Sequence, residues 1–255
     1  MSTSENSILN FFKACGFEIE KIPESNEKSP DFLLNDGKHT FLLELKQKFD
    51  SDELIKTRNN AFDKNSVFEQ LNVVQRTNRN SNIIKSASKQ LLAQKKKFSA
   101  DFCIIVFEAT GLSGELKRDQ FKSSLYGTVE LMNLGDNYVP PKTCYFYENS
   151  DFYNQRDVLD ASFIFSETEG QLCLNPLSPN YEHFKQSSLV ELFHKGVVDP
   201  IYLEQKKFAY VVNGAVNRKD KQELEQYLSQ KYGFDRLVPF NYPELSHSFR
   251  VEVES

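Results

Sequence analysis

Residues 29–48 contain two short apolar stretches on either side of Asp36-Gly37, a pattern that predicts a β-hairpin. The Asp-Gly pair favours a two-residue type I′ turn, because both central positions of that turn need a positive φ. A turn at this position places Asp31 opposite Leu42 on the second strand. The sequence therefore predicts the register of the hairpin as well as its existence.

The second strand of this hairpin has one charged face and one apolar face. Because side chains alternate along a strand, two faces are predicted. One carries Leu42, Glu44, Lys46 and Lys48, and the other carries Phe41, Leu43, Leu45 and Phe49. Asp31 falls on the charged face, diagonally across from Glu44, where about 7–8 Å separates the Cα atoms. An Asp, a Glu and a Lys are thus predicted to converge. The alternative is an edge hairpin with a solvated charged face, since charges also protect sheet edges from aggregation.

The segments around the hairpin predict an α/β sandwich. They comprise a helix over residues 4–15, a strand over 17–22, a helix over 82–98 and a buried strand over 101–107. The polar, Asn-rich residues 50–80 predict an inserted loop with room for one helix.

The second half of the chain has weaker patterns, which predict elements that extend the same sheet or dock on it. These are strands over 143–146, 161–165, 171–174 and 208–212, and helices over 181–195 and 220–231. No repeat or low-complexity linker separates the two halves. The predicted organisation is a core over residues 1–110 and an α+β extension over residues 111–255.

The net charge of −5 conceals a basic block. Residues 38–98 contain 13 Lys and Arg but only 6 Asp and Glu. A basic block beside the carboxylates of the hairpin suits a polyanionic partner, and a solvated helix face is the alternative. The acidic charge of the whole chain argues against indiscriminate coating of nucleic acid.

Composition and motifs argue against several other classes of protein. No stretch approaches the ~18 apolar residues of a membrane helix, and the N-terminus lacks the pattern of a secretory signal. The four cysteines are far apart without a C-x-x-C pair, which predicts reduced, mostly buried cysteines in a cytoplasmic protein rather than structural zinc. There is no P-loop and no dinucleotide fingerprint.

The predicted charged face suits a divalent cation. Carboxylate oxygens from Asp31 and Glu44 are the hard ligands that Mg²⁺ prefers, and Mg²⁺ keeps several of its waters. The backbone carbonyl of Leu45 can add a further oxygen. A bound Mg²⁺ polarises a phosphodiester and helps to form hydroxide from water, while Lys46 can orient that water or offset charge in the transition state.

At these residues the chain resembles the PD-(D/E)xK nuclease superfamily, which has the restriction-endonuclease-like fold. Pro30-Asp31 and Glu44-Leu45-Lys46 match the two halves of the motif, and the hairpin between them matches as well. The resemblance spans residues 4–107. It implies a mixed sheet flanked by helices, with an αβββαβ core and here a large C-terminal elaboration. It also implies two metal ligands, a catalytic lysine, a glutamine on the following helix and, weakly, an acid on the first helix: Asp31 and Glu44, Lys46, Gln90, and Glu5.

Other candidate motifs carry less weight. Glu115-Leu116-Lys117 repeats the E-x-K letters but follows a Gly-rich segment without a Pro-Asp hairpin, and it is predicted to be surface. Gly111-Leu-Ser-Gly114 is one residue short of G-x-S-x-G. The histidines are dispersed, and core or surface roles are expected for them rather than a ligand pair: His39, His183, His194 and His247.

The expected function is a Mg²⁺-dependent endonuclease or other phosphodiesterase acting on nucleic acid, with DNA favoured and Mn²⁺ able to substitute. The residues expected to contact the phosphate backbone are Lys48, Arg76, Arg79, Lys85 and Lys89. One alternative is a catalytically silent nucleic-acid- or protein-binding module with the same fold. Another is a nuclease that works only in an assembly, with residues 111–255 recognising a partner protein or a DNA sequence, or forming a homodimer.

Overall fold

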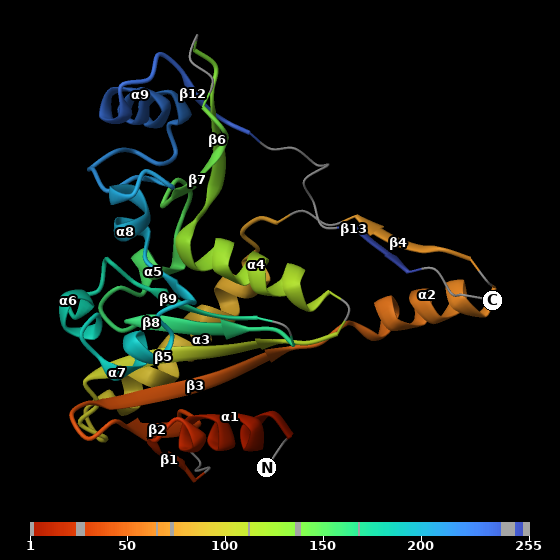
Figure 1. The fold of residues 1–255 in the computed structure, drawn as a ribbon, viewed down its shortest axis with the longest axis vertical. Helices are drawn as coiled ribbons and strands as arrows, with labels where there is room; N and C mark the ends of the chain where they lie inside the picture. The colour runs from red at the N-terminus through yellow and green to blue at the C-terminus, as the bar shows by residue number, and fades with distance from the viewer. Residues whose placement is uncertain are drawn as a thin grey trace.

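A seven-stranded mixed sheet lies at the centre of the structure and is flanked by helices (Figure 1). The computed structural model describes residues 3–23, 29–64, 66–71, 74–111, 113–135, 139–167, 169–240 and 248–251. The strands, in their order across the sheet, are β1 (Glu18–Lys21), β2 (Phe32–Asn35), β3 (Thr40–Lys48), β5 (Phe102–Ala109), β8 (Ala161–Phe165), β9 (Gly170–Leu174) and β10 (Val197–Val198). The pairs β3–β5, β5–β8 and β9–β10 are parallel, and the others are antiparallel.

The hairpin is present, but its predicted register is wrong by two residues. Asn35 pairs with Thr40 rather than Lys38, so the connection is residues 36–39. The side chain of Asp36 causes the shift, because its Oδ1 accepts from the backbone N–H groups two and three residues later, at 2.9 and 2.6 Å, as Asp does in tight turns. A shift of two preserves the face on which every side chain lies.

Helices cover both faces of the seven-stranded sheet. On one face lies α1 (Thr3–Ala14), which is joined farther along by the short helices α6 (Tyr181–Phe184) and α7 (Ser188–Leu192). On the other face lie α3 (Asn78–Lys95) and α4 (Gly114–Tyr126). Six consecutive residues of β5, from Phe102 to Phe107, are buried, which confirms the prediction of a strand covered on both sides.

The segment predicted as an inserted loop is more ordered than expected. It forms α2 (Asp52–Asp63), capped by the Ser51 side chain, and the strand β4 (Phe68–Leu71). β4 pairs antiparallel with β13 (Ser248–Val251), far along the chain, and the pair projects beside α2 away from the main sheet (Figure 1). A strand whose partner is so distant in sequence leaves no local signal.

A second sheet of four strands is built from the second half of the chain. It contains, in spatial order, β11 (Tyr210–Val211), β7 (Lys142–Tyr145), β6 (Val129–Asn133) and β12 (Leu237–Pro239). The remaining helices are α5 (Asp151–Asn154), α8 (Pro200–Gln205) and α9 (Lys221–Tyr232). Figure 1 shows this sheet and α9 extending from the α4 side of the main sheet, opposite α1.

Two predictions for the second half need correction. The helix expected over 181–195 is interrupted at Ser187, whose extended backbone separates α6 from α7. Glu115-Leu116-Lys117 lies in the first turn of α4 rather than in a surface loop, and the Leu116 and Lys117 side chains are buried. Among the described residues no helix is both long and apolar enough to cross a membrane.

Candidate active site

Asp31 and Glu44 lie side by side where the β2–β3 hairpin opens. Asp31 immediately precedes β2, and the pairing of Phe32 with Leu43 places it opposite Glu44 rather than diagonally across from it. Its backbone N–H donates to the Leu43 carbonyl at 3.0 Å. Its carboxylate Oδ2 accepts from the N–H of Leu45 at 2.7 Å. The strand backbone therefore fixes the position of the Asp31 carboxylate.

Glu44 is buried although it carries an ionisable group. Only 1% of its surface is exposed, and Lys46 donates to its Oε1 in a close ion pair. Its other oxygen, Oε2, is also buried and accepts from no donor among the residues that the structure describes, while the Asp31 and Glu44 carboxyl groups lie close enough to share a proton. A buried carboxylate oxygen without a partner is costly for a folded protein, and such an atom indicates a missing partner or a functional role.

The two carboxyl groups influence each other's ionisation. Burial and then the negative charge of Asp31 raise the pKa of Glu44 to about 7, against the opposing charge of Lys46. Burial also raises the pKa of Asp31, although the N–H of Leu45 and the Lys46 charge lower it. Two carboxylates that resist ionisation together favour a bound cation or a shared proton.

Gln90 reaches the same place from α3. The Lys46 ammonium donates to its Oε1 at 3.4 Å, and its Nε2 donates to the carbonyl of Ser29 at 3.4 Å. Gln90 thus connects the catalytic-lysine candidate to the segment just before Asp31. The structure brings together all four side chains that the sequence singled out for chemistry: Asp31, Glu44, Lys46 and Gln90.

The open edge of β3 can supply backbone oxygen as well. The carbonyls of Thr40 and Lys48 accept from the β5 side, so the odd-numbered residues of β3 turn their N–H and C=O groups toward β2. The backbone N–H and C=O groups of Leu45 therefore point toward the edge on which Asp31 lies. Two carboxylates and a carbonyl suit Mg²⁺, which keeps several waters. The described residues contain no cluster of three or more His, Cys, Asp or Glu side chains with metal-binding geometry.

Glu5 adds a third negative charge from the first helix. It forms an ion pair with Lys21 of β1 at 2.8 Å, and its charge contributes to the raised pKa of Asp31. α1 begins beside the open edge of the hairpin, which is why an acid in its first turn acts on the site. The ion pair with Lys21 holds Glu5 in this position.

A cationic cluster, made of Lys48 and Arg79, lies beyond the carboxylates at the end of β3. The Lys48 ammonium donates to Oδ1 of Asn80 at 3.1 Å. Burial and then the charges of Arg79 and Lys117 lower its pKa to about 8. Arg79 is exposed on α3 and lies eleven residues before Gln90, or about three full turns, so both lie on one flank of the helix. The cluster faces the same side as the site.

The remaining predicted cations lie elsewhere, with Arg76 just before α3 and Lys85 and Lys89 on it. Arg76 and Lys85 line a hollow together with Asp151 of α5, and Ser81 in that hollow donates to the Asp151 carboxylate at 2.6 Å. Lys85 is offset from Arg79 by six residues, or about 240° around the helix. Lys89 is exposed on the outward side. These three side chains are therefore separated from the Lys48–Arg79 flank.

Two groups of interacting side chains were not predicted from the sequence. Asp50, just past β3, accepts from buried Lys117 and from Ser113 Oγ (2.5 Å), which fixes the end of β3 to α4. His39 and His183 face each other with 3.1 Å between their Nε2 atoms. Both groupings join residues more than 60 positions apart, and neither has a local motif.

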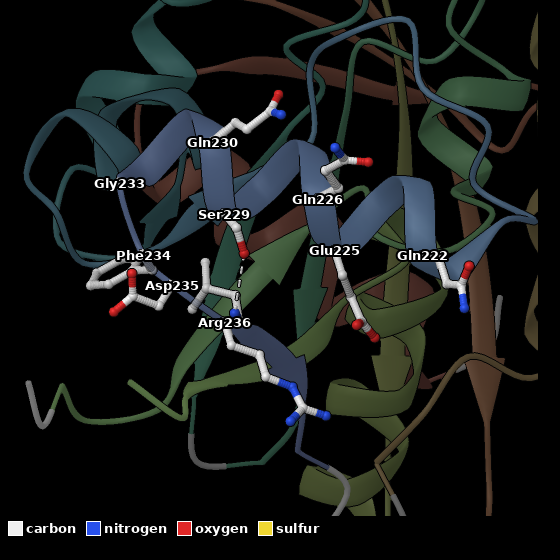
Figure 2. A pocket seen from close by; sticks show the side chains of 10 residues that line it. Gln222, Glu225, Gln226, Ser229, Gln230, Gly233, Phe234, Asp235 and Arg236 are labelled. Atoms are coloured by element: carbon white, nitrogen blue, oxygen red, sulfur yellow. Dashed lines mark hydrogen bonds between the residues drawn. The ribbon is translucent and has the colours of Figure 1, made fainter. Parts of the chain in front are cut away.

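A different hollow lies at the far end of the molecule, between α9 and residues 233–237 (Figure 2). Figure 2 shows Ser229 directed at this segment, where its Oγ accepts from the N–H of Leu237 at 3.3 Å. Its other lining side chains are largely amides and charged groups, including Glu225 and Arg236. It lacks the buried, mutually coupled ionisable groups that distinguish the hairpin site.

Comparisons with known proteins found no match. No family model matches the chain, and neither a curated protein nor a solved structure matches it. Function is therefore inferred from the residues of the site and their geometry.

Proposed function

We propose that this chain is a Mg²⁺-dependent nuclease with a restriction-endonuclease-like fold of the PD-(D/E)xK type, and that it hydrolyses phosphodiester bonds, with DNA favoured. The observation that carries the proposal is the buried Glu44 carboxylate. One of its oxygens lacks a partner among the described residues, and Asp31 and Lys46 lie beside it on the same face.

The donor set around Glu44 fits a hard divalent cation. Asp31, Glu44 and the Leu45 carbonyl would hold the ion, with Mn²⁺ able to replace Mg²⁺. When bound, the ion supplies Lewis-acid polarisation of a phosphate oxygen and a water of lowered pKa. The unpartnered Oε2 of Glu44 and the coupling between the two carboxyl groups support this assignment.

Lys46 supplies the positive charge that phosphodiester hydrolysis needs next to the carboxylates. Its ammonium is held on two sides, by Glu44 and by Gln90, and its side chain is 26% exposed. From this position it can donate to an attacking water or a phosphate oxygen. Fixed donors aimed at developing charge are commonly the largest electrostatic contribution to catalysis.

Lys48 and Arg79 extend positive charge from the site along one flank of α3. Burial is the main cause of the lowered pKa of Lys48, and a phosphate bound there would relieve the repulsion from neighbouring cations that adds to it. We therefore assign these two residues to the phosphate backbone nearest the site, where they would release counterions on binding.

A cleavage assay tests the proposal. The full chain is incubated with single- and double-stranded DNA and RNA in Mg²⁺, Mn²⁺ or EDTA. Glu44→Ala and Lys46→Ala are each expected to reduce metal-dependent cleavage by at least about 100-fold. Two exposed, distant residues give matched controls, Glu182→Ala and Lys221→Ala, which should retain the activity. Full activity in the Glu44→Ala/Lys46→Ala double variant would overturn the proposal.

A second candidate is a catalytically silent nucleic-acid-binding module on the same fold. It is favoured by the exposed Arg79 and the half-buried Lys48 beside the site, which can hold a phosphate backbone without a metal ion. Binding to nucleic acid that is unchanged by EDTA, with no cleavage of any substrate in the same assay, would establish it.

A further inference from the structure

His39 and His183 form a contact that the nuclease proposal does not use. His39 ends the β2–β3 connection and His183 lies on α6, and their Nε2 atoms are 3.1 Å apart. The ring centroids are 4.9 Å apart. Two imidazole nitrogens meeting this closely either share one N–H proton or direct two lone pairs at a common cation.

Asp36 favours the tautomer of His39 in which Nε2 can bind a metal ion. Its Oδ2 lies 3.3 Å from Nδ1 of His39, so an N–H at Nδ1 leaves the lone pair on Nε2, toward His183. In metal sites, a carboxylate commonly accepts from the second ring nitrogen of a metal-bound histidine in this way and so fixes the orientation of the ring. Asp36 is itself held, because Ser188 of α7 donates to Oδ2 and two backbone N–H groups donate to Oδ1.

The aromatic surroundings hold both rings in place. Phe102, the first residue of β5, lies 5.5 Å from the His39 ring and 5.1 Å from the His183 ring, centroid to centroid. Phe41, which packs beside Phe102, lies 6.1 Å from the His39 ring, centroid to centroid. His183 is exposed, so coordination positions beyond the two nitrogens would open to solvent.

We propose that His39 and His183 form a two-histidine site for a borderline divalent transition metal, with Zn²⁺ as the representative ion. Metal–nitrogen bonds of about 2.0–2.1 Å place two tetrahedral ligand atoms about 3.3 Å apart, close to the separation in the structure. Neutral imidazole suits Zn²⁺, Cu²⁺ and Ni²⁺ rather than Mg²⁺. The remaining positions are filled by water or by an external ligand.

This site is separate from the carboxylates of the hairpin. His39 precedes the first residue of β3 and Glu44 lies five residues later, about 17 Å along the strand. A metal ion bound by both histidines would fasten the β2–β3 connection to α6. The inference does not rest on the nuclease proposal, and the two sites prefer different metals.

Zinc titration in excess Mg²⁺ tests the proposal on the full chain. We expect calorimetry to show one equivalent of Zn²⁺ bound, and Co²⁺ to give a d–d absorption band. His39→Ala and His183→Gln should each weaken Zn²⁺ binding at least tenfold. Zn²⁺ should raise the thermal midpoint of the wild-type chain but not of these variants, because a ligand stabilises only the state that binds it.

Two further variants make the outcome specific. His194→Ala is the matched control, since His194 is a histidine whose Nδ1 contacts the carbonyl of Glu191 instead, and it should bind Zn²⁺ like the wild type. Glu44→Ala should also retain the Zn²⁺ equivalent. If the wild type binds no Zn²⁺, or if His39→Ala and His183→Gln bind it as tightly as the wild type, the pair is only an N–H···N hydrogen bond or a packing contact.

Discussion

Glu44 occupies the position in the site where a negative charge is least solvated. It is 1% exposed, and a carboxylate lies next to it. Lys46 neutralises one of its oxygens, but the other has no partner among the described residues. In the absence of a cation, the ionised form of Glu44 should therefore cost the fold stability.

Glu44→Gln should stabilise the metal-free protein at pH 8 but have little effect at pH 5. The pKa of Glu44 is raised from 4.5 to about 7, so between these values the folded state binds more protons than the unfolded state. The free energy of unfolding of the wild type therefore falls as pH rises through this window. The predicted gain at pH 8 is at most about 3 kcal/mol, measured by urea unfolding in EDTA.

Glu182→Gln provides the control for this prediction, because Glu182 is exposed and its substitution should change stability equally little at both pH values. A destabilised Glu44→Gln variant at pH 8 would contradict the account of Glu44 as a carboxylate that awaits a cation.

At the scale of elements, the alternation of the β2–β3 hairpin was predictable and its turn was not. Period two is a property of the strand itself, so Glu44 and Lys46 could be assigned to one face. The length of the turn depends on which backbone N–H groups the Asp36 side chain accepts from. The dipeptide Asp-Gly is compatible with both the two-residue and the four-residue connection. The connection has four residues where two were predicted. Because the difference is even, Asp31 stays on the predicted face.

α4 shows why other elements were missed. Its buried surface includes Lys117, Arg118, Ser123 and Ser124 beside apolar residues, so the 3.6-residue hydrophobic pattern is weak. Lys117 is buried because Asp50 at the end of β3 neutralises it, and Arg118 forms an ion pair with Glu169 at 2.6 Å. Such pairings belong to tertiary structure and cannot be read from local sequence.

The positions of the cations around α3 predict unequal roles in binding nucleic acid. The slope of the logarithm of the DNA-binding constant against log [salt] is negative. The Lys48→Ala/Arg79→Ala double variant should make it shallower by about 2, one unit for each lost phosphate contact. Arg76→Ala/Lys85→Ala, on the hollow with Asp151, should change it by less than about one unit. Fluorescence anisotropy with labelled DNA in EDTA, which prevents cleavage, measures both slopes. The reverse order of effects would show that the backbone follows the other flank of α3.

At the scale of the whole molecule, the seven-stranded sheet combines both halves of the chain. β8 pairs with β5, and Phe121 of α4 stacks on Phe107 of β5 with 3.8 Å between ring centroids. A fragment of residues 1–110 would leave β5 as a long apolar edge strand, which is a site of aggregation. The candidate site lies within residues 1–110, but the fold that holds it extends beyond them.

We therefore expect the 1–110 fragment to lack a cooperative unfolding transition and to aggregate, whereas the full chain unfolds cooperatively. Size-exclusion chromatography and circular dichroism during urea unfolding distinguish the two. A monomeric, cooperatively folded fragment would show that residues 111–255 are dispensable for the core.

The most direct test of the central claim is anomalous diffraction from a crystal of this protein soaked in Mn²⁺. We expect a peak within bonding distance of the Asp31 and Glu44 carboxylates and on the side of the Leu45 carbonyl, with Lys46 adjacent. A well-occupied crystal with no peak between Asp31 and Glu44, or with Asp31 turned away from Glu44, would contradict it.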